Sequence, residues 1–324
     1  MKPRSVPSRR FDREISGVLL LDKPSGISSS QALQIARRMF AASKAGHTGT
    51  LDPMATGLLP VCFGEATKFS SLLLGADKTY EATLRLGYTS TTGDAEGEIS
   101  PMLGRACGEA LTLSHLHEVL QTFTGTSLQI PPMYSALKHK GKPMYLYARE
   151  GIAVDREPRE IFIHELRGEA ASNDEVRIVV ACGTGTYIRT LAEDIGRALG
   201  YGSAYLTALR RTASGPFRVS DAITLGAIKN MSTGERDHCV LPVDRLALGL
   251  PAVNLNETAA AFLKQGRTVE DYACESSLRE AETVRVYDEE NHFLGLGEVT
   301  ALHAIAPKRL INPSHCLDKP STPC

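Results

Sequence analysis

The sequence lacks the features that mark membrane, secreted and disulfide-stabilised proteins. No apolar run approaches the ~18–20 residues of a membrane-spanning helix, and no apolar core follows the basic first ten residues, MKPRSVPSRR. The seven cysteines are odd in number, widely spaced and without a CxxC pair, which argues against a disulfide framework and a zinc site. We therefore expect a protein of the reducing cytoplasm that makes no contact with a membrane.

The short motifs of the common cofactor and nucleophile sites are also missing. The chain has no GxGxxG, no Walker loop and no GxSxG elbow. His47 and Asp52 are five residues apart, a spacing that does not fit the HExxH metal motif. The segment GTGTY at 183–187 could hold a phosphate at a helix N-terminus, but it is short and weak as a motif. The sequence predicts neither a cofactor nor a bound metal.

An overall excess of basic charge is absent as well. Hydrophobic residues make up 42% and charged residues 23%, as in an ordinary globular protein, and the formal net charge of −1 alone argues against a nucleic-acid binder. Residues 131–159 nevertheless hold six lysines and arginines against three acidic residues. The cluster Lys138–Lys142, beside aromatic residues, is therefore a candidate for phosphate contacts. Isolated basic pairs such as Arg210-Arg211 are interpreted as solvated surface.

Apolar periodicity predicts strands and helices in alternation. A buried strand is expected at 17–21 and a half-buried strand at 78–87, and strands resume at 159–166 and 175–182. The first helix follows Ser28, which has capping-box spacing from Gln31. Further helices are expected at 65–74, 114–123 and 185–200, with Thr186 able to cap the last one.

Composition divides the chain into segments. We expect a disordered basic tail at 1–12, a main domain at 13–249, a small β-rich domain at 250–312 and a tail at 313–324. Two adjacent prolines and a Lys/Tyr-rich stretch mark an inserted arm at about 128–156. No internal repeat of fixed period is present.

One aspartate stands in a mostly apolar segment, AGHTGTLDPMATGLLPVCFGEATKF. Pro53 biases Asp52 towards an extended backbone, and Gly49 and Gly57 permit tight turns on either side of it. A carboxylate in an apolar site has a raised pKa unless a cation is near, so a catalytic role for Asp52 requires an arginine. Spacing alone favours the alternative in which Asp52 caps a following helical turn.

Four further blocks accompany that segment, and together they resemble the bacterial tRNA pseudouridine synthase B family. They are GVLLLDKPSGISSS, DKTYEATLRLG, IPPMYSALKHKGKPMYLYAREG and GTYIRTLAEDIGRALG with LTALRRT. The resemblance runs in order from Gly17 to about Asn312. It implies an α+β fold with a mixed, mostly antiparallel sheet flanked by helices. It also implies an RNA-binding arm and a C-terminal domain similar to a PUA domain.

The resemblance also implies roles for individual residues. Asp52 matches the catalytic aspartate, Tyr80 the tyrosine that stacks on the target base and can transfer a proton, and Arg189 the arginine that pairs with the carboxylate. The remaining matches are substrate-binding or pocket residues and a lysine near the site: His47, Tyr187, Leu209 and Lys23. Leu209 depends on how LRR is aligned, and Thr184 departs from the lysine or serine that many relatives have there.

The implied activity is isomerisation of uridine 55 in the TΨC loop of tRNA to pseudouridine, with the base flipped out and no cofactor. The protein would act on tRNA as a monomer, without an obligatory protein partner. Two alternatives remain open: a tRNA-binding folding factor with secondary catalysis, and a relative of the guide-RNA-dependent enzymes. Attack on C1′, addition to C6 and deprotonation of C2′ are all compatible with a carboxylate at Asp52.

Overall fold

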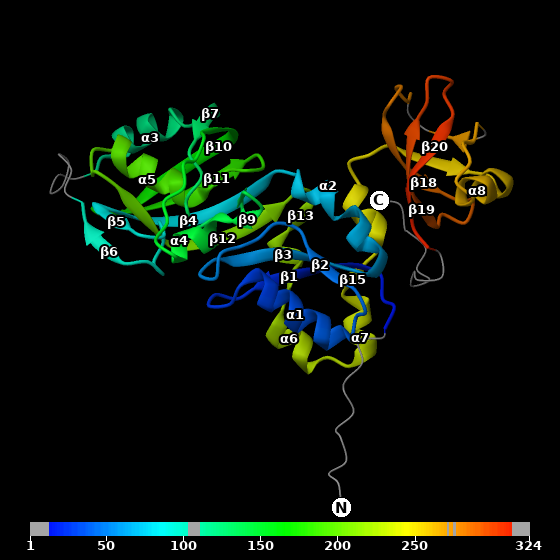
Figure 1. Ribbon diagram of the computed structural model, residues 1–324, viewed down its shortest axis with the longest axis horizontal. Coiled ribbons are helices and arrows are strands. Elements are labelled where there is room, and N and C mark those ends of the chain that lie inside the picture. Colours follow the sequence, from blue (N-terminus) through cyan, green and yellow to red (C-terminus); the bar gives the residue numbers. More distant parts are fainter. Residues whose placement is uncertain (1–12, 103–110, 271, 275–276, 313–324) are drawn as a thin grey trace, which may run out of the picture.

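A long twisted sheet runs through most of the chain (Figure 1). The structure is a computed structural model that describes residues 13–102, 111–270, 272–274 and 277–312. The tails expected at 1–12 and 313–324 lie outside the described residues. Within the described part of the chain the large sheet has 11 strands, in the order β14-β1-β3-β12-β4-β11-β10-β7, with β2 beside β3, β13 beside β12 and β15 beside β1.

The sheet is mixed and mostly antiparallel, as expected. Only the β1–β14 and β12–β3 pairs of this described sheet are parallel. The strands are β1 (Gly17–Lys23), β2 (Ala45–His47), β3 (Thr56–Phe63), β4 (Lys78–Leu86), β7 (Gly125–Gln129), β10 (Arg159–Ser172), β11 (Glu175–Cys182), β12 (Ala204–Ser214), β13 (Phe217–Arg218), β14 (Ile223–Thr224) and β15 (Val240–Leu241).

Helices cover one face of the sheet along its length. Four helices contribute apolar residues to the core on this face: α1 (Ser29–Phe40), α3 (Leu113–Gln121), α5 (Ile188–Ala198) and α6 (Leu225–Asn230). A further helix, α7 (Thr233–His238), packs beside α1. The other face is covered at the β1–β3 end by the 3₁₀ helices η1 (Gly64–Phe69) and η3 (Val243–Ala247) and by α2 (Ser70–Leu74); a third 3₁₀ helix is η2 (Val219–Asp221). The sheet therefore separates two apolar cores.

Helix starts follow the expected chemistry in one case and depart from it in another. Ser28 and Gln31 form a complete capping box at the start of α1. The prediction that Thr186 caps α5 is wrong: Tyr187 is the N-cap residue and makes no side-chain capping bond. The Thr186 hydroxyl instead donates to the Gly183 carbonyl at 3.1 Å, within the loop before the helix.

The segment after Asp52 forms a central strand, β3, which is not among the strands predicted from the sequence. β3 is buried over seven of its eight residues and pairs with both β1 and β2. Pro60 hides this strand in the sequence, because proline cannot donate a ladder hydrogen bond. Its carbonyl still accepts from the Thr48 N–H at 3.1 Å. No helical turn follows Asp52, so the interpretation of Asp52 as a helix cap does not hold.

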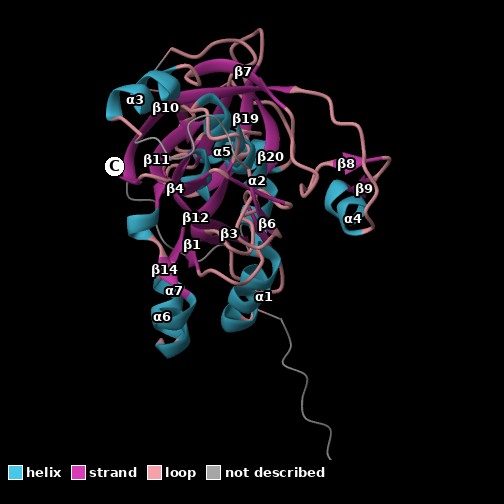
Figure 2. Cartoon of the chain, turned by 90° about the vertical axis from the view of Figure 1, so that its left-hand side faces the viewer, coloured by secondary structure: helices cyan, strands magenta, loops and turns pink. Residues whose placement is uncertain are grey.

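Two small hairpins lie outside the large sheet. One consists of β5 (Tyr88–Ser90) and β6 (Ile99–Pro101). The other consists of β8 (Lys138–His139) and β9 (Lys142–Pro143), followed by α4 (Met144–Arg149). The second hairpin and α4 follow β7 and precede β10 in the chain, and they stand away from the body of the molecule (Figure 2).

A separate β-rich domain follows residue 250, as expected (Figure 1). Its sheet has the order β17-β16-β18-β19-β20 and its own apolar core. The elements are β16 (Ala252–Leu255), α8 (Glu257–Lys264), β17 (Tyr272–Ala273), β18 (Thr283–Tyr287), β19 (Phe293–Val299) and β20 (Ile305–Leu310). Tyr287 and Phe293 pack into the second core of the large sheet, which fixes the domain against it. Among the described residues, no helix is long and apolar enough to cross a membrane.

The large sheet has two halves, β14-β1-β3 and β12-β4-β11-β10-β7, which are joined by a short pairing of β3 with β12. β12 pairs with β4 from Ala204 to Ser214 but meets β3 only at Arg210 and Arg211. Beyond that junction, the segment between β5 and β6 that carries Asp94 forms an isolated bridge to Leu206 of β12. The two halves of the sheet thus bring distant segments of chain together at one point.

Candidate active site

Asp52 projects from a loop that is held at both ends. The Ser29 hydroxyl of α1 donates to the Leu51 carbonyl at 2.9 Å and accepts from the Leu51 N–H at 2.8 Å. On the other side, the Ala55 N–H donates to the Asp52 carbonyl at 3.1 Å. These backbone bonds leave the Asp52 side chain free to point away from the loop.

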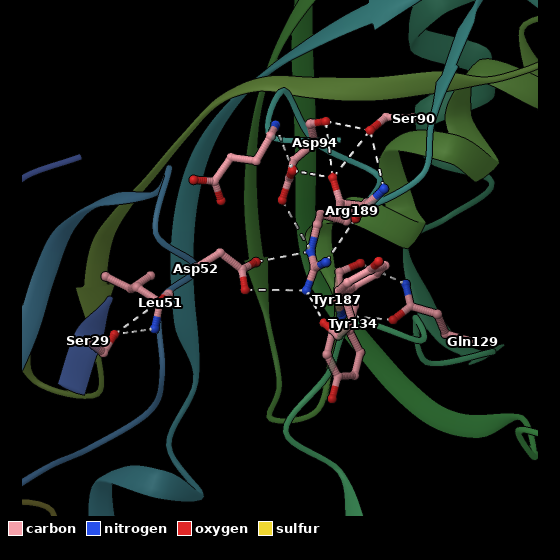
Figure 3. A network of polar contacts seen from close by, with 11 residues as sticks. Ser29, Leu51, Asp52, Ser90, Asp94, Gln129, Tyr134, Tyr187 and Arg189 are labelled. Atoms are coloured by element: carbon pink, nitrogen blue, oxygen red, sulfur yellow. Dashed lines mark hydrogen bonds and ion pairs between the residues drawn. The ribbon is translucent and has the colours of Figure 1, made fainter. Parts of the chain in front are cut away.

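The Asp52 carboxylate meets the guanidinium of Arg189, as the resemblance implies (Figure 3). Arg189 Nε is 3.0 Å from Asp52 Oδ2, and Nη2 donates to Oδ1 at 3.3 Å. Such a two-point contact fixes the carboxylate plane as well as its distance. The Arg189 side chain is 6% exposed and the Asp52 side chain 33%, so the cation lies inside and the carboxylate faces outward. Arg189 also donates to the carbonyls of Thr92 at 2.9 Å and Tyr134 at 2.7 Å.

A second carboxylate, Asp94, approaches the same guanidinium, and the sequence analysis did not find it. Asp94 Oδ2 is 4.0 Å from Arg189 Nε, and the side chain is almost fully buried. Thr92 donates to Asp94 Oδ1 at 2.5 Å. Its segment, YTSTTGDAEGE, is polar and carries no motif that would single out Asp94. Arg189 sits in the first turn of α5, where the helix dipole disfavours a cation, and the two carboxylates offset that cost.

The charge state of Asp52 results from opposing effects. Burial raises the pKa of the Asp52 carboxyl above its ordinary value, and Asp94 raises it further. Arg189 and Lys23 act in the opposite direction, but burial is the largest effect. The expected arginine is therefore present, and it limits the rise in the Asp52 pKa rather than abolishing it.

Tyr80 lies on β4 in the middle of the sheet, half-buried against the helix-covered core. Burial raises the pKa of the Tyr80 phenol, while the charge of Arg211 acts in the opposite direction. Leu209, on the neighbouring strand β12, is opposite Ala82 in the register and buried in the same core. Tyr80 and Leu209 therefore contribute to one side of the sheet.

Tyr187 and His47 lie on opposite halves of the site. The backbone of Tyr187 is fixed by Gln129, whose amide accepts from its N–H at 2.8 Å and donates to its carbonyl at 3.1 Å (Figure 3). Burial raises the pKa of the Tyr187 phenol. His47, at the end of β2, has a buried Nδ1 without a hydrogen-bond partner among the described residues, and burial lowers its pKa.

Lys23 is fully buried beneath the loop that carries Asp52. Its ammonium donates to three carbonyls, those of Pro24 at 2.9 Å, Ile27 at 2.7 Å and Pro53 at 3.1 Å. Burial lowers the pKa of Lys23 to about 8. The bond to Pro53 attaches the residue after Asp52 to the end of β1, so Lys23 holds the loop rather than pointing to its open side.

Arg211 contradicts the interpretation of its basic pair as solvated surface, since the side chain is 1% exposed. Its neighbour Arg210 is partly exposed and forms a two-point ion pair with Asp22 at 2.7 and 3.0 Å. Lys23, Lys78 and Arg211 are all buried cations, and the charges of Lys23 and Arg211 act on the pKa values of Asp52 and Tyr80, respectively. In the part of the chain that the structure describes, none of the three has a carboxylate within 4.0 Å, and backbone carbonyls satisfy them instead.

A cavity of about 1130 Å³ is lined by residues of β4, β11 and β12, and Tyr80 is not among them. Its lining includes Leu209 and Met54 but neither Asp52 nor Arg189. The candidate chemistry therefore lies outside this cavity. Among the described residues, no group of three or more His, Cys, Asp or Glu side chains could hold a metal ion.

Sequence comparisons first define the class of protein. The profile of the TruB family pseudouridylate synthase N-terminal domain matches residues 37–188. Profiles described as the tRNA pseudouridylate synthase B C-terminal domain and as pseudouridine synthase II TruB, C-terminal, match residues 189–247 and 251–311. The fold that carries the Asp52–Arg189 pair is thus that of a pseudouridine synthase.

Full-length relatives then identify the family. A tRNA pseudouridine synthase B of Nitrosospira multiformis is 59% identical over 301 residues, 92% of this chain and 96% of the relative. One of Nitrosomonas europaea is 52% identical over 293 residues, 90% and 95% of the two chains. The chain belongs to the TruB family of pseudouridine synthases.

Solved structures share the fold at greater distance. A Cbf5-Nop10-Gar1 complex contains a chain that superposes with a TM-score of 0.69 and 26% identity, over 92% of this chain and 85% of that one. A chain from an H/ACA RNP bound to a substrate RNA has the same TM-score, 24% identity and the same coverage.

Proposed function

We propose that the protein isomerises uridine 55 in the TΨC loop of tRNA to pseudouridine, with Asp52 as the catalytic carboxylate. The observation that carries the proposal is the two-point contact of a partly exposed Asp52 with a buried Arg189. The charge of Asp52 also acts on the half-buried Tyr80, whose pKa it raises. The names of the relatives at 59% and 52% identity support tRNA as the substrate.

The reaction breaks the N1–C1′ bond of the nucleotide, joins C5 to C1′, and replaces the hydrogen on C5 by one on N1. It needs a carboxylate at one side of the nucleotide and a flat surface that holds the free base while it turns. Asp52 supplies the first, fixed in direction by Arg189. Tyr80 supplies the second, since an aromatic ring can stack on the base while its hydroxyl exchanges a proton.

The target base lies in a folded loop of RNA and must be flipped out to reach Asp52. Unstacking costs a few kcal/mol, which stacking in the site and contacts to the RNA backbone offset. The hairpin β8–β9 with α4 carries exposed Lys138 and Lys140 and stands clear of the body, which suits it to contact the phosphates. The C-terminal domain, PUA-like by resemblance, is placed in the proposal as a second contact to tRNA.

A specific substrate tests the proposal. The substrate is a T-arm stem-loop with tritium on C5 of uridine 55 alone, and the matched control carries the label on uridine 54. We expect tritium release from the first RNA only. Asp52→Asn should abolish the release and leave RNA binding largely intact, because the amide keeps the shape of the side chain and loses its charge. Asp237→Asn is the matched control: it removes an ion pair with Arg13 at 2.7 Å, on a side chain 24% exposed and away from the site, and should turn over like the parent.

Turnover by Asp52→Asn near that of the parent would contradict the catalytic role of Asp52. Equal tritium release from the two labelled RNAs would contradict uridine 55 as the modified position. The two alternatives give different results. A folding factor would improve tRNA refolding whether or not Asp52 is present. A guide-dependent enzyme would be inactive on bare tRNA without added RNA or proteins. We expect activity from the protein alone, as a monomer.

A further inference from the structure

Arg211 occupies the junction where the two halves of the sheet meet. In the register, it lies opposite Gly57 of β3 on one side and opposite Tyr80 of β4 on the other. Its side chain is among the largest that are fully buried in the described structure. A cation in this place is costly unless its donors are satisfied.

The donors of Arg211 are directed at both sides of the loop that carries Asp52. Nε donates to the Leu58 carbonyl at 2.7 Å, and Nη2 donates to the Gly49 carbonyl at 3.1 Å. Asp52 lies between these two residues in the chain. Arg211 is also the cross-strand neighbour of Tyr80, and its charge lowers the pKa of the Tyr80 phenol. One guanidinium therefore holds both sides of the loop next to the strand that carries the aromatic residue.

Two glycines provide the space for this arrangement. Gly57 has φ +99°, and a Cβ there would collide with the backbone of Arg211. Gly49 has φ +81°, and a Cβ there would lie 3.3 Å from Arg211 Nη1. The close approach of the loop to Arg211 accounts for glycine at both positions, which spacing alone had assigned only to tight turns.

We propose that Arg211 is a positioning residue that keeps Asp52 and Tyr80 in one relative geometry. The inference rests on the proposed pseudouridine-forming activity. The two carbonyls that Arg211 binds lie on either side of Asp52, and Tyr80 is its cross-strand neighbour. A shift of this guanidinium would therefore change how the carboxylate and the aromatic ring lie relative to each other.

The groups around Tyr80 determine what a titration should show. Arg211 lowers the pKa of the phenol, whereas Cys182 of β11 and Asp52 raise it, in addition to burial. Removing the charge of Arg211 should therefore move the Tyr80 pKa upward. A merely structural change elsewhere in the core would leave that titration in place.

The test compares Arg211→Gln and Arg211→Lys with the matched control Arg210→Gln, which changes the neighbouring, partly exposed arginine of the same strand. Three quantities are measured: the single-turnover rate at saturating T-arm RNA, the Kd of that RNA, and the titration of Tyr80 in protein labelled with fluorotyrosine. Tyr80→Phe assigns the fluorine signal.

We expect Arg211→Gln to slow the single turnover by about 100-fold with Kd nearly unchanged, because a displacement of about 1 Å in a catalytic group can cost that much. The Tyr80 pKa should rise in Arg211→Gln and stay in place in Arg210→Gln. Arg211→Lys should recover part of the rate, since it keeps the charge but cannot hold both carbonyls in the fixed geometry of a guanidinium. In a Tyr80→Phe background the Arg211→Gln change should cost less, as expected for coupled residues.

Parent-like rates in Arg211→Gln, or an unmoved Tyr80 titration, would overturn the inference. If Arg211→Gln does not fold, the same two readouts in Arg211→Lys decide. Should the parent protein form no pseudouridine at all, the proposed function fails. The fluorine titration would then still report whether Arg211 sets the state of Tyr80.

Discussion

Removing the buried guanidinium of Arg189 should destabilise the protein in a pH-dependent way. Arg189→Gln deletes the partner of Asp52 at 3.0 Å and of Asp94 at 4.0 Å, and it leaves the Thr92 and Tyr134 carbonyls without their donor. Breaking a buried pair by removing one partner typically costs 3–5 kcal/mol. Because the Asp52 side chain is 33% exposed, solvent screens part of that loss. We therefore expect about 3 kcal/mol at neutral pH.

The sign of the pH dependence follows from the Asp52 pKa. This pKa is raised in the folded protein, so the ionised carboxylate opposes folding, and stability falls as pH rises through the interval between the unfolded and folded values. Arg189 lowers the Asp52 pKa, so its removal extends that interval upward. Arg189→Gln should consequently lose more stability at about pH 7 than at about pH 4, where the carboxyl is largely protonated.

Urea unfolding of the parent and variant at both pH values measures the difference. Arg197→Gln is the matched control on the same helix: it removes an exposed ion pair with Asp194 at 2.8 Å on a side chain 60% exposed, and should cost less than about 1 kcal/mol at either pH. A loss in Arg189→Gln that is equal at the two pH values, or no larger than that of Arg197→Gln, would refute the reasoning.

Three further changes have definite expected results. Gly26→Ala, at φ +83° in open space, should lower the free energy of unfolding by about 1 kcal/mol in urea. Gly57→Ala should lower it clearly more, because the added Cβ would collide with the backbone of Arg211. Equal losses in the two variants would contradict this expectation. Because the Lys23 pKa is lowered in the folded protein, the parent should gain stability as pH rises from about 8 towards the ordinary lysine value. Lys23→Met should not show this gain. A difference in unfolding free energy between parent and variant that stays constant across that range would contradict a lowered Lys23 pKa. Replacing Lys138 and Lys140 together by alanine should reduce the slope of log K against log salt for RNA binding by about 0.7–0.9 per lost phosphate contact, with the saturated rate unchanged.

The elements with local signals could be predicted from the sequence. The capping box at Ser28 and Gln31 and the apolar stripe of α5 place these helices correctly, because each depends on residues within a few turns. β3 was missed because Pro60 interrupts a run of residues that otherwise reads as a buried strand. Thr186 was a reasonable cap by type, but its hydroxyl finds the Gly183 carbonyl in its own loop.

The site could be predicted only in part, because its contacts join segments far apart in the chain. The pairing of Asp52 with Arg189 came from family resemblance, since no spacing rule connects residues 137 positions apart. Asp94 looked like any acid in a polar loop, and Arg211 like one of several surface arginines. Burial distinguishes both, and burial of a charged side chain depends on tertiary packing that local pattern does not carry.

Three distant elements fix the position of Asp52, and its own loop could not do so alone. α1 holds Leu51 through Ser29, α5 supplies Arg189 to the carboxylate, and β12 supplies Arg211 to both ends of the loop. The loop itself contributes glycines, which cost conformational entropy when they are ordered and gain stability only through such contacts. A carboxylate fixed from three directions needs no rearrangement when a nucleotide arrives, which is the condition under which a single charged group is most effective in catalysis. In the proposed reaction, the one aspartate of this segment can therefore serve as the catalytic carboxylate without a second acid in its own loop, because the rest of the fold supplies the residues that hold it.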